Sequence, residues 1–262
     1  MLHVHPVPAF SDNYLWVIHD GKNAAVVDPG DAKPVLDYLA ANDLTLTDIL
    51  CTHHHADHVD GVEAILDFLG LRGAIPVYGP AGERIPARTQ ALREGDQIAL
   101  PALGLELDVL DVPGHTAGHI AYVTRDGGND LLFCGDTLFA CGCGRLFEGT
   151  AAQMTESLGK LKKLPGNTRV YCAHEYTMAN IKFAEAVEPD NADLKLRKAF
   201  CAAKRHRNQP TVPSTIALEL ATNPFLRWDS KAVIAAAEHR AGHALNSDVD
   251  VFATIREWKN NF

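Results

Sequence analysis

The chain has 262 residues, which is enough for one large domain or for one domain with a smaller appendage. Hydrophobic residues make up 47% of it and charged residues 22%, both close to globular averages, which excludes a long disordered or low-complexity protein. The formal net charge of −9 argues against a nucleic-acid-binding protein, because phosphate contacts need a basic surface.

The chain start shows no basic segment followed by an apolar run and a small-residue cleavage site. No uninterrupted apolar stretch approaches the ~18–20 residues that a membrane span requires. We therefore expect a cytoplasmic protein without membrane contact. The cysteines fit this location, because Cys51, Cys134 and Cys172 each end an apolar run and are expected to be buried free thiols.

Short apolar runs closed by turns fill the first two thirds of the chain, a pattern typical of a layered, mixed α/β domain. Residues 15–18 and 24–27 flank the turn 20–23 and predict a β-hairpin. A similar pattern recurs with strands 120–124 and 131–134 around the turn 126–129. Each hairpin ends in a loop with an acidic residue, so we expect two related halves facing each other.

Two further apolar runs, 49–53 and 170–174, each deliver a histidine just past a strand end. Loops at the ends of strands can converge on one edge of a sandwich, where a polar site does not disturb the core. Amphipathic helices are expected between the strands, over residues 34–41, 59–69 and 151–164, the last begun by a capping box of Thr150 and Gln153.

The strand pattern disappears after residue 175, and the remaining segments all predict helices: 176–187, 191–207, 215–221, 230–241 and 248–260. We therefore predict a catalytic α/β domain over residues 1–174 and a smaller all-helical domain over 175–262. One expected helix carries several cations, which could contact an anionic partner: Lys195, Arg197, Lys198, Lys204, Arg205 and Arg207. We favour the interpretation that they form a solvated face balanced by acidic residues elsewhere.

The segment 52–61 holds the spacing H-x-H-x-D-H. In an extended loop, His53, His55 and Asp57 project to one side and His58 to the other. His53 and His55 can then hold one ion while Asp57 and His58 hold a second. Imidazole and carboxylate suit Zn, Fe(II) or Mn, and the absence of a thiolate in the motif argues against a closed structural zinc site.

Two ions need more ligands than this motif supplies. His115, in a P-G-H-T sequence, can complete the first site, and the strand-end His174 the second, while the carboxylate of Asp136 can bridge them. Open coordination positions then remain for a bridging water, so the pattern predicts a dinuclear hydrolytic centre.

Several neighbouring residues have ordinary explanations. His54 is expected to pack or hydrogen-bond beneath the site, and His119 to pack or to orient a ligand. Cys141 and Cys143 form a C-x-C pair without distant partner pairs, which is weak as a metal or redox motif. The G-x-S-x-G, H-E-x-x-H and G-x-x-x-x-G-K-[ST] motifs are all absent from the sequence.

With these ligands, the sequence resembles the metallo-β-lactamase superfamily, whose fold is an αββα sandwich. The whole chain further resembles the glyoxalase II family, the hydroxyacylglutathione hydrolases, in the segments 8–14, 133–139, 142–150, 173–177 and 255–262. This resemblance implies hydrolysis of S-(2-hydroxyacyl)glutathione, mainly S-D-lactoylglutathione, to glutathione and D-lactate in methylglyoxal degradation.

The resemblance also implies two divalent metal ions, with zinc expected and iron or manganese as alternatives. A metal-bridging hydroxide would attack the thioester, with Asp57 and Asp136 as catalytic ligands. Substrate contacts are implied at Arg145, Phe147, Tyr176, Arg256 and Lys259. Some relatives carry Lys and Tyr at the first two positions, so Phe147 lacks a hydroxyl that could contact the peptide. Glutathione carries carboxylates, so cations in an acidic protein suit it.

The alternative in another class is a persulfide dioxygenase, which resembles this family but uses one iron and oxygen on glutathione persulfide. The long helical C-terminal region favours the hydrolase. The expected partner is therefore a small glutathione thioester, and we expect a monomer.

Overall fold

The computed structural model describes residues 1–124 and 130–262, and these form two compact units. Unit 1 comprises Met1–Asp111 and Thr116–Gly135, and unit 2 comprises Val112–His115 and Asp136–Phe262. Strands and helices alternate first and helices dominate later, which confirms the predicted mixed α/β class. The domain boundary between residues 174 and 175 stays a prediction, because these compact units divide the chain differently.

The first sheet of unit 1 has six strands in the order β1-β2-β3-β4-β5-β6. β1 to β3 are antiparallel and β3 to β6 parallel, and the predicted hairpin is confirmed by the pairing of β2 with β3. The strands are β1 His3–Ala9, β2 Asn13–His19, β3 Asn23–Val27, β4 Thr45–Leu50, β5 Val77–Pro80 and β6 Gln90–Leu92.

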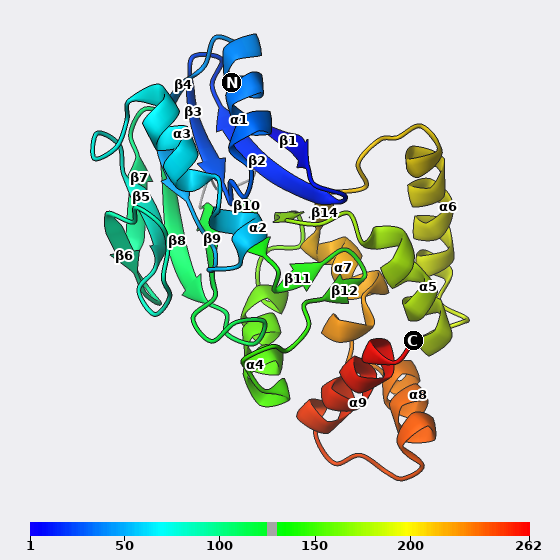
Figure 1. Ribbon diagram of the computed structural model, residues 1–262. Helices are drawn as coiled ribbons and strands as arrows, with labels where there is room; N and C mark the ends of the chain where they lie inside the picture. The colour runs from blue at the N-terminus through cyan, green and yellow to red at the C-terminus, as the bar shows by residue number, and fades with distance from the viewer. Residues whose placement is uncertain (125–129) are drawn as a thin grey trace. The chain divides into compact units, whose positions relative to one another are not determined.

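Two helices cover one face of this sheet: α1 (Ala32–Ala41) and α3 (Val62–Leu69). Figure 1 shows both lying along the strands. Alternate residues of the strands join them in one apolar core, as the two-residue side-chain period requires. Val17, Val26 and Ile49 come from the strands, and Val35 and Ile65 from the helices. β2 is buried on both faces except at its last residue, so the sheet has a second packed side.

The second sheet within unit 1 runs β7-β8-β9-β10, all antiparallel. Its strands are β7 Gln97–Leu100, β8 Leu105–Asp111, β9 Ile120–Thr124 and β10 Leu131–Gly135. The pairing of β9 with β10 confirms the second predicted hairpin, although its predicted turn, 126–129, lies outside the described residues. Tyr122 is buried and donates to the Cys51 carbonyl, which ties this sheet to the end of β4.

The single helix predicted over 59–69 is wrong in its start. The chain instead forms α2 (Ala56–Val59), breaks, and resumes as α3. Gly61 causes the break, because a Cβ there would lie 2.5 Å from the Pro29 carbonyl oxygen, and its N–H donates to that oxygen. The extended geometry expected for H-x-H-x-D-H therefore ends at His55, and Asp57 and His58 lie on a helical turn.

Unit 2 begins with the small antiparallel hairpin of β11 (Leu138–Phe139) and β12 (Gly142–Cys143). Helix α4 (Ala151–Lys162) follows, and its predicted capping box of Thr150 and Gln153 is present. β13 (Arg169–Cys172) pairs with β14 (Ser214–Thr215). That pairing corrects the expectation that strands end before residue 175: a two-residue strand is too short to leave a pattern.

The predicted C-terminal helices are confirmed within one or two residues at their ends. They are α5 Thr177–Val187, α6 Ala192–His206, α7 Ile216–Thr222, α8 Lys231–Ala241 and α9 Asp248–Asn260. The short 3-10 helix η1 (Pro224–Leu226) was not predicted. Figure 1 shows α8 and α9 side by side near the C-terminus. Rings of Phe183, Phe225, Phe252 and Trp258 form an aromatic cluster among α5, η1 and α9.

The basic face predicted on α6 is only partly solvated. Arg197 is buried and pairs with the fully buried Glu219 of α7 at 2.5 Å, so for this residue the interpretation is wrong. Lys198 does pair with an acidic residue elsewhere, Glu185 at 2.7 Å. A buried ion pair is stable only when both charges are compensated, and here Ser214 also donates to Glu219.

All six cysteines are buried free thiols, as predicted for three of them. Burial raises the pKa of Cys141 and of Cys172 to about 12, so neither is a reactive thiolate near neutral pH. None of the described helices combines the length and apolar character that crossing a bilayer demands.

Candidate metal centre

The H-x-H-x-D-H segment of unit 1 places its imidazoles close together. His53 and His58 are buried, and the Nε2 atom of His53 lies 3.1 Å from the Nδ1 atom of His55. Two nitrogens bound to one tetrahedral zinc are about 3.3 Å apart, since each metal–nitrogen bond is about 2.0–2.1 Å. His53 and His55 therefore have the spacing of ligands to one ion.

Asp28 anchors this group from the loop after β3. It is 3% exposed and accepts from the backbone N–H and the hydroxyl of Thr52, at 2.7 and 2.8 Å. Its Oδ2 atom also lies 3.1 Å from Nδ1 of His58, and the Thr52 hydroxyl lies 3.1 Å from Nδ1 of His53. Because their Nδ1 atoms are engaged, His53 and His58 present Nε2 to an ion.

Asp57 lies beside His58, with its Oδ2 atom 3.5 Å from His58 Nε2. Asn13 donates to the same carboxylate oxygen at 3.0 Å and thereby orients it. Gly30 allows the chain to pass behind Asp57, because a Cβ there would lie 1.8 Å from the Asp57 carbonyl oxygen. These contacts bring Asp57 and His58 together, as expected for the second predicted pair of ligands.

His119 and His54 lie beside the predicted ligands and make the packing and hydrogen-bond contacts expected for them. His119 is fully buried and stacks on His53, with 4.5 Å between the ring centroids, so it fixes that ring's orientation. His54 bonds through Nδ1 to Glu83 at 2.9 Å. Glu83 also accepts from the Thr116 hydroxyl and the Gly118 N–H, which holds the chain just after His115.

Unit 2 holds the remaining three predicted ligands, in which two histidines contact one carboxylate. Oδ2 of Asp136 lies 3.3 Å from Nε2 of His115, and Oδ1 lies 3.3 Å from Nε2 of His174. All three residues are at most 6% exposed. A carboxylate that turns one oxygen toward each of two histidines has the geometry of a bridge between two ions, because each oxygen–nitrogen pair has the separation of ligands on one metal.

Both histidines of this group make further contacts that orient their rings. Nδ1 of His115 donates to the carbonyl oxygen of Arg145 at 2.9 Å, which leaves Nε2 to face Asp136. The ring of His174 stacks on Tyr176, with centroids 4.7 Å apart and planes within 3°, and Phe139 meets it edge-on. The donors in each unit, imidazole and carboxylate without thiolate, suit Zn, Fe or Mn.

The predicted substrate contacts of unit 2 differ in exposure. Arg145 and Phe147 are exposed, and the Phe147 ring packs edge-on against His115 at 5.2 Å while remaining 62% exposed. Tyr176 is 37% exposed beside His174. Both aromatic rings therefore lie next to predicted ligands and are partly exposed.

Lys259 and Arg256 lie three residues apart on α9 but in different surroundings. Lys259 is half-buried, with its ammonium 5.2 Å from the Phe183 ring centroid. Burial, followed by the neighbouring charge of Arg256, lowers the pKa of Lys259 to about 8. Arg256 is 4% exposed and donates to the Cys143 carbonyl at 2.9 Å, so its guanidinium lies inside unit 2.

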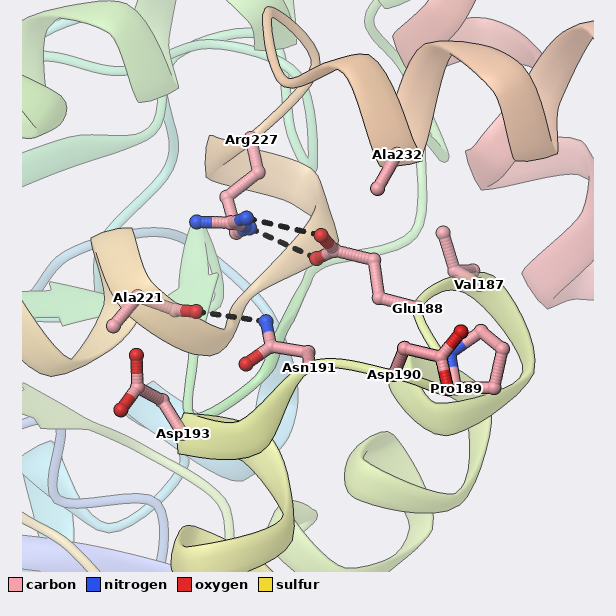
Figure 2. A pocket seen from close by; sticks show the side chains of 9 residues that line it. All are labelled: Val187, Glu188, Pro189, Asp190, Asn191, Asp193, Ala221, Arg227 and Ala232. Carbon is pink, nitrogen blue, oxygen red and sulfur yellow. Dashed lines mark hydrogen bonds and ion pairs between the residues drawn. The ribbon is translucent and has the colours of Figure 1, made fainter.

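A separate hollow of about 430 Å³ opens at the junction of α5 and α6. Figure 2 shows Arg227 facing Glu188 there, in a double ion pair at 2.8 and 3.0 Å. Asn191 bonds across it to the Ala221 carbonyl at 2.9 Å. None of the nine lining residues is a predicted site residue. These contacts join α5 to the segment after α7 and serve the fold.

Comparison with protein-family models places the whole chain. Residues 10–174 match the model of the metallo-β-lactamase superfamily, and residues 175–262 match that of the hydroxyacylglutathione hydrolase C-terminus. The chain belongs to the hydroxyacylglutathione hydrolase family. It is therefore a metal-dependent hydrolase with the metallo-β-lactamase fold, as the sequence predicted.

Relatives named hydroxyacylglutathione hydrolase match this family member over their full length. The one from Cupriavidus taiwanensis is 59% identical over 266 residues, and the one from Nitrosomonas eutropha is 54% identical over 262 residues, with 100% of both chains covered in each case. One from Pseudomonas aeruginosa is 53% identical over 265 residues, again with 100% of both chains covered.

Solved structures share the fold at lower identity. ETHE1 from Myxococcus xanthus has a TM-score of 0.65 at 25% identity, covering 98% of this chain and 91% of that one. TTHA1623, in a di-iron-bound form, has a TM-score of 0.59 at 26% identity, covering 85% of this chain and 100% of that one.

Sequence reasoning missed several residues that support the ligands in this hydroxyacylglutathione hydrolase family member. Asp28 had a signal, since the D-P-G sequence after a strand marks a constrained loop. In the structure its φ is left-handed, at +52°. Asn13 begins β2 and Thr52 follows β4, and neither carries a distinctive spacing. The Arg145 carbonyl is backbone and leaves no residue-type signal.

We predict that Asp28→Asn weakens metal binding by about 10–100-fold, because the amide replaces a carboxylate that orients His58 through Nδ1. Chelator competition measures the affinity. Asp43→Asn is the matched control, since Asp43 is exposed and has nearly the same φ, +51°. Equal metal affinities in the two variants would contradict the role of Asp28.

Proposed function

We propose that this protein hydrolyses S-(2-hydroxyacyl)glutathione, mainly S-D-lactoylglutathione, to glutathione and D-lactate, as a step of methylglyoxal detoxification. The observation that carries this proposal is the full-length identity of 54–59% with relatives named hydroxyacylglutathione hydrolase. The ligand arrangement supports it, because an imidazole and carboxylate set suits a hydrolytic metal centre.

We further propose that two divalent ions bind to the seven predicted ligands, and that zinc is the usual ion, with iron and manganese as alternatives. The ligands are His53, His55, Asp57, His58, His115, Asp136 and His174. Within unit 1 the supporting observation is the 3.1 Å between His53 and His55, and within unit 2 it is the two 3.3 Å contacts of Asp136.

The ions would lower the pKa of a shared water to about 7 and polarise the thioester carbonyl. The protein's own residues fix where this chemistry occurs. Asp57 is held by Asn13 and is 41% exposed in its side chain, so it can also orient the attacking water. A thiol has a pKa near 8.5, so the glutathione thiolate can leave without a dedicated general acid.

Substrate recognition is proposed at the exposed face of unit 2. Phe147 and Tyr176 offer aromatic surface beside His115 and His174. The cations of Arg145, Arg256 and Lys259 suit the carboxylates of the glutathione moiety. Phe147 has no hydroxyl, so its contribution is apolar contact alone.

We also propose that the protein acts as a cytoplasmic monomer on this small molecule, without nucleic-acid or membrane partners. The six free, buried thiols support a reducing compartment. The net charge of −9 supports the absence of a nucleic-acid partner.

The direct test measures thioester loss from S-D-lactoylglutathione by the metal-loaded protein. We expect turnover that a chelator abolishes and that added zinc restores. Oxygen consumption with glutathione persulfide serves as the control for the dioxygenase alternative, and we expect none. A metal-loaded protein that leaves the thioester intact, or that consumes oxygen instead, would overturn the proposal.

The lowered pKa of Lys259 predicts a pH-dependent KM. Below pH 8 the ammonium is charged and attracts a substrate carboxylate. Above pH 8 it loses its proton and that attraction, so KM should rise between about pH 8 and 9. Steady-state kinetics from pH 6.5 to 9, corrected for spontaneous thioester hydrolysis, give the profile.

Lys259→Arg is the matched variant for this profile, because a guanidinium stays charged over the whole range. Its KM should stay nearly constant above pH 8. A KM that is equally flat in the unsubstituted protein would show that Lys259 does not bind the substrate as a cation.

A further inference from the structure

Arg256 is a buried cation with an unusual set of partners. It is 4% exposed, its Nη1 atom donates to the Cys143 carbonyl at 2.9 Å, and its guanidinium carbon lies 5.0 Å from the Phe225 ring centroid. Among the described residues, no carboxylate oxygen lies within 4.0 Å of its nitrogens. Burying a charge costs free energy, so the contacts with the Cys143 carbonyl and the Phe225 ring must compensate that cost.

That carbonyl begins the segment that supports a predicted metal ligand. Cys143 ends β12, and two residues later the Arg145 carbonyl accepts from Nδ1 of His115 at 2.9 Å. Between them, Gly144 lies so close to the ligands that a Cβ on it would be 2.0 Å from the Asp136 carbonyl oxygen and 3.0 Å from His115 Nδ1. A shift of the Cys143 carbonyl would therefore also move Gly144 and the Arg145 carbonyl, which lie against Nδ1 of His115.

Three further carbonyls of the β11–β12 hairpin also accept hydrogen bonds from side chains. Asn223 donates to the carbonyls of Phe139 and Gly142 at 3.1 and 2.9 Å, and Asn180 donates to that of Ala140 at 3.1 Å. Each of these donors comes from the helical C-terminal segment. Arg256 completes the series at Cys143, the hairpin position nearest to Arg145.

We propose that Arg256 is a positioning residue for the metal centre. It holds Cys143, and through it the Arg145 carbonyl, so that His115 keeps Nε2 directed at its ion. Lys259, one turn further along α9, is intermediate in exposure and remains a proposed substrate-binding cation. The inference deepens the proposed function and rests on it only in taking His115 as a metal ligand.

The test compares Arg256→Met with Lys259→Met. Zinc affinity is measured by chelator competition without substrate, the cobalt-substituted protein gives an absorption spectrum of the ligand geometry, and S-D-lactoylglutathione gives kcat and KM. We expect Arg256→Met to weaken zinc binding by about 10–100-fold and to alter the cobalt spectrum. Lys259→Met should leave both unchanged and raise KM.

Arg256→Lys adds a rescue arm, because its ammonium can still donate to one carbonyl and should restore part of the zinc affinity. Thermal unfolding of each metal-free variant shows whether it folds, and Arg256→Gln replaces Arg256→Met if the methionine variant does not. Wild-type zinc affinity in Arg256→Met, with only a raised KM, would overturn the positioning role and leave Arg256 as a substrate contact alone. The zinc measurement needs no substrate. A wild-type protein that fails to hydrolyse the thioester would therefore contradict the proposed function but not the positioning role of Arg256.

Discussion

The approach of two histidines to one carboxylate is the constraint on which the candidate site depends. Asp136 turns one oxygen to His115 and the other to His174, each at 3.3 Å, and all three side chains are buried. Burying several polar and ionisable groups together costs free energy unless charge and hydrogen bonds compensate it. Two divalent ions would supply that compensation, which is why the remaining contacts are best understood as supports for ligands.

These supports fall into two kinds. Carboxylates and hydroxyls hold the histidines of unit 1, where Asp28 reaches both Thr52 and His58. A backbone carbonyl, that of Arg145, holds His115 in unit 2, and a carbonyl can be aimed only by fixing the chain that carries it. Side chains of the helical C-terminal segment do that by donating to the β11–β12 hairpin. On our proposals, the helical C-terminal segment of this chain would help to form the centre as well as to bind the thioester.

Much of the fold was predictable because its signals are local. Hairpins, the capping box of Thr150 and the strand-end histidines depend on spacing and turn chemistry within a few residues. The break at Gly61 was not predictable, since it comes from a close approach to Pro29 across the fold. Arg197 was expected on a solvated face because arginine usually is exposed, and Arg256 was expected to contact the substrate, but tertiary partners bury both.

In the candidate site, too, some residues could be predicted from sequence and others could not. Its ligands follow a motif whose residue types and spacing are set by metal chemistry, whereas Asp28 and the Arg145 carbonyl support them from positions that tertiary structure alone brings near. The family match explains why the substrate could be named from sequence at all, because spacing leads to two ions and an activated water but specifies no thioester.

The central claim is that the seven ligands hold two ions bridged by Asp136. Anomalous diffraction from crystals of the zinc-loaded protein tests it most directly. Two zinc peaks are predicted, each about 2.0–2.2 Å from its histidine and carboxylate ligands, with the two Asp136 oxygens on different ions. A single peak, or an Asp136 carboxylate that contacts only one ion, would contradict the account.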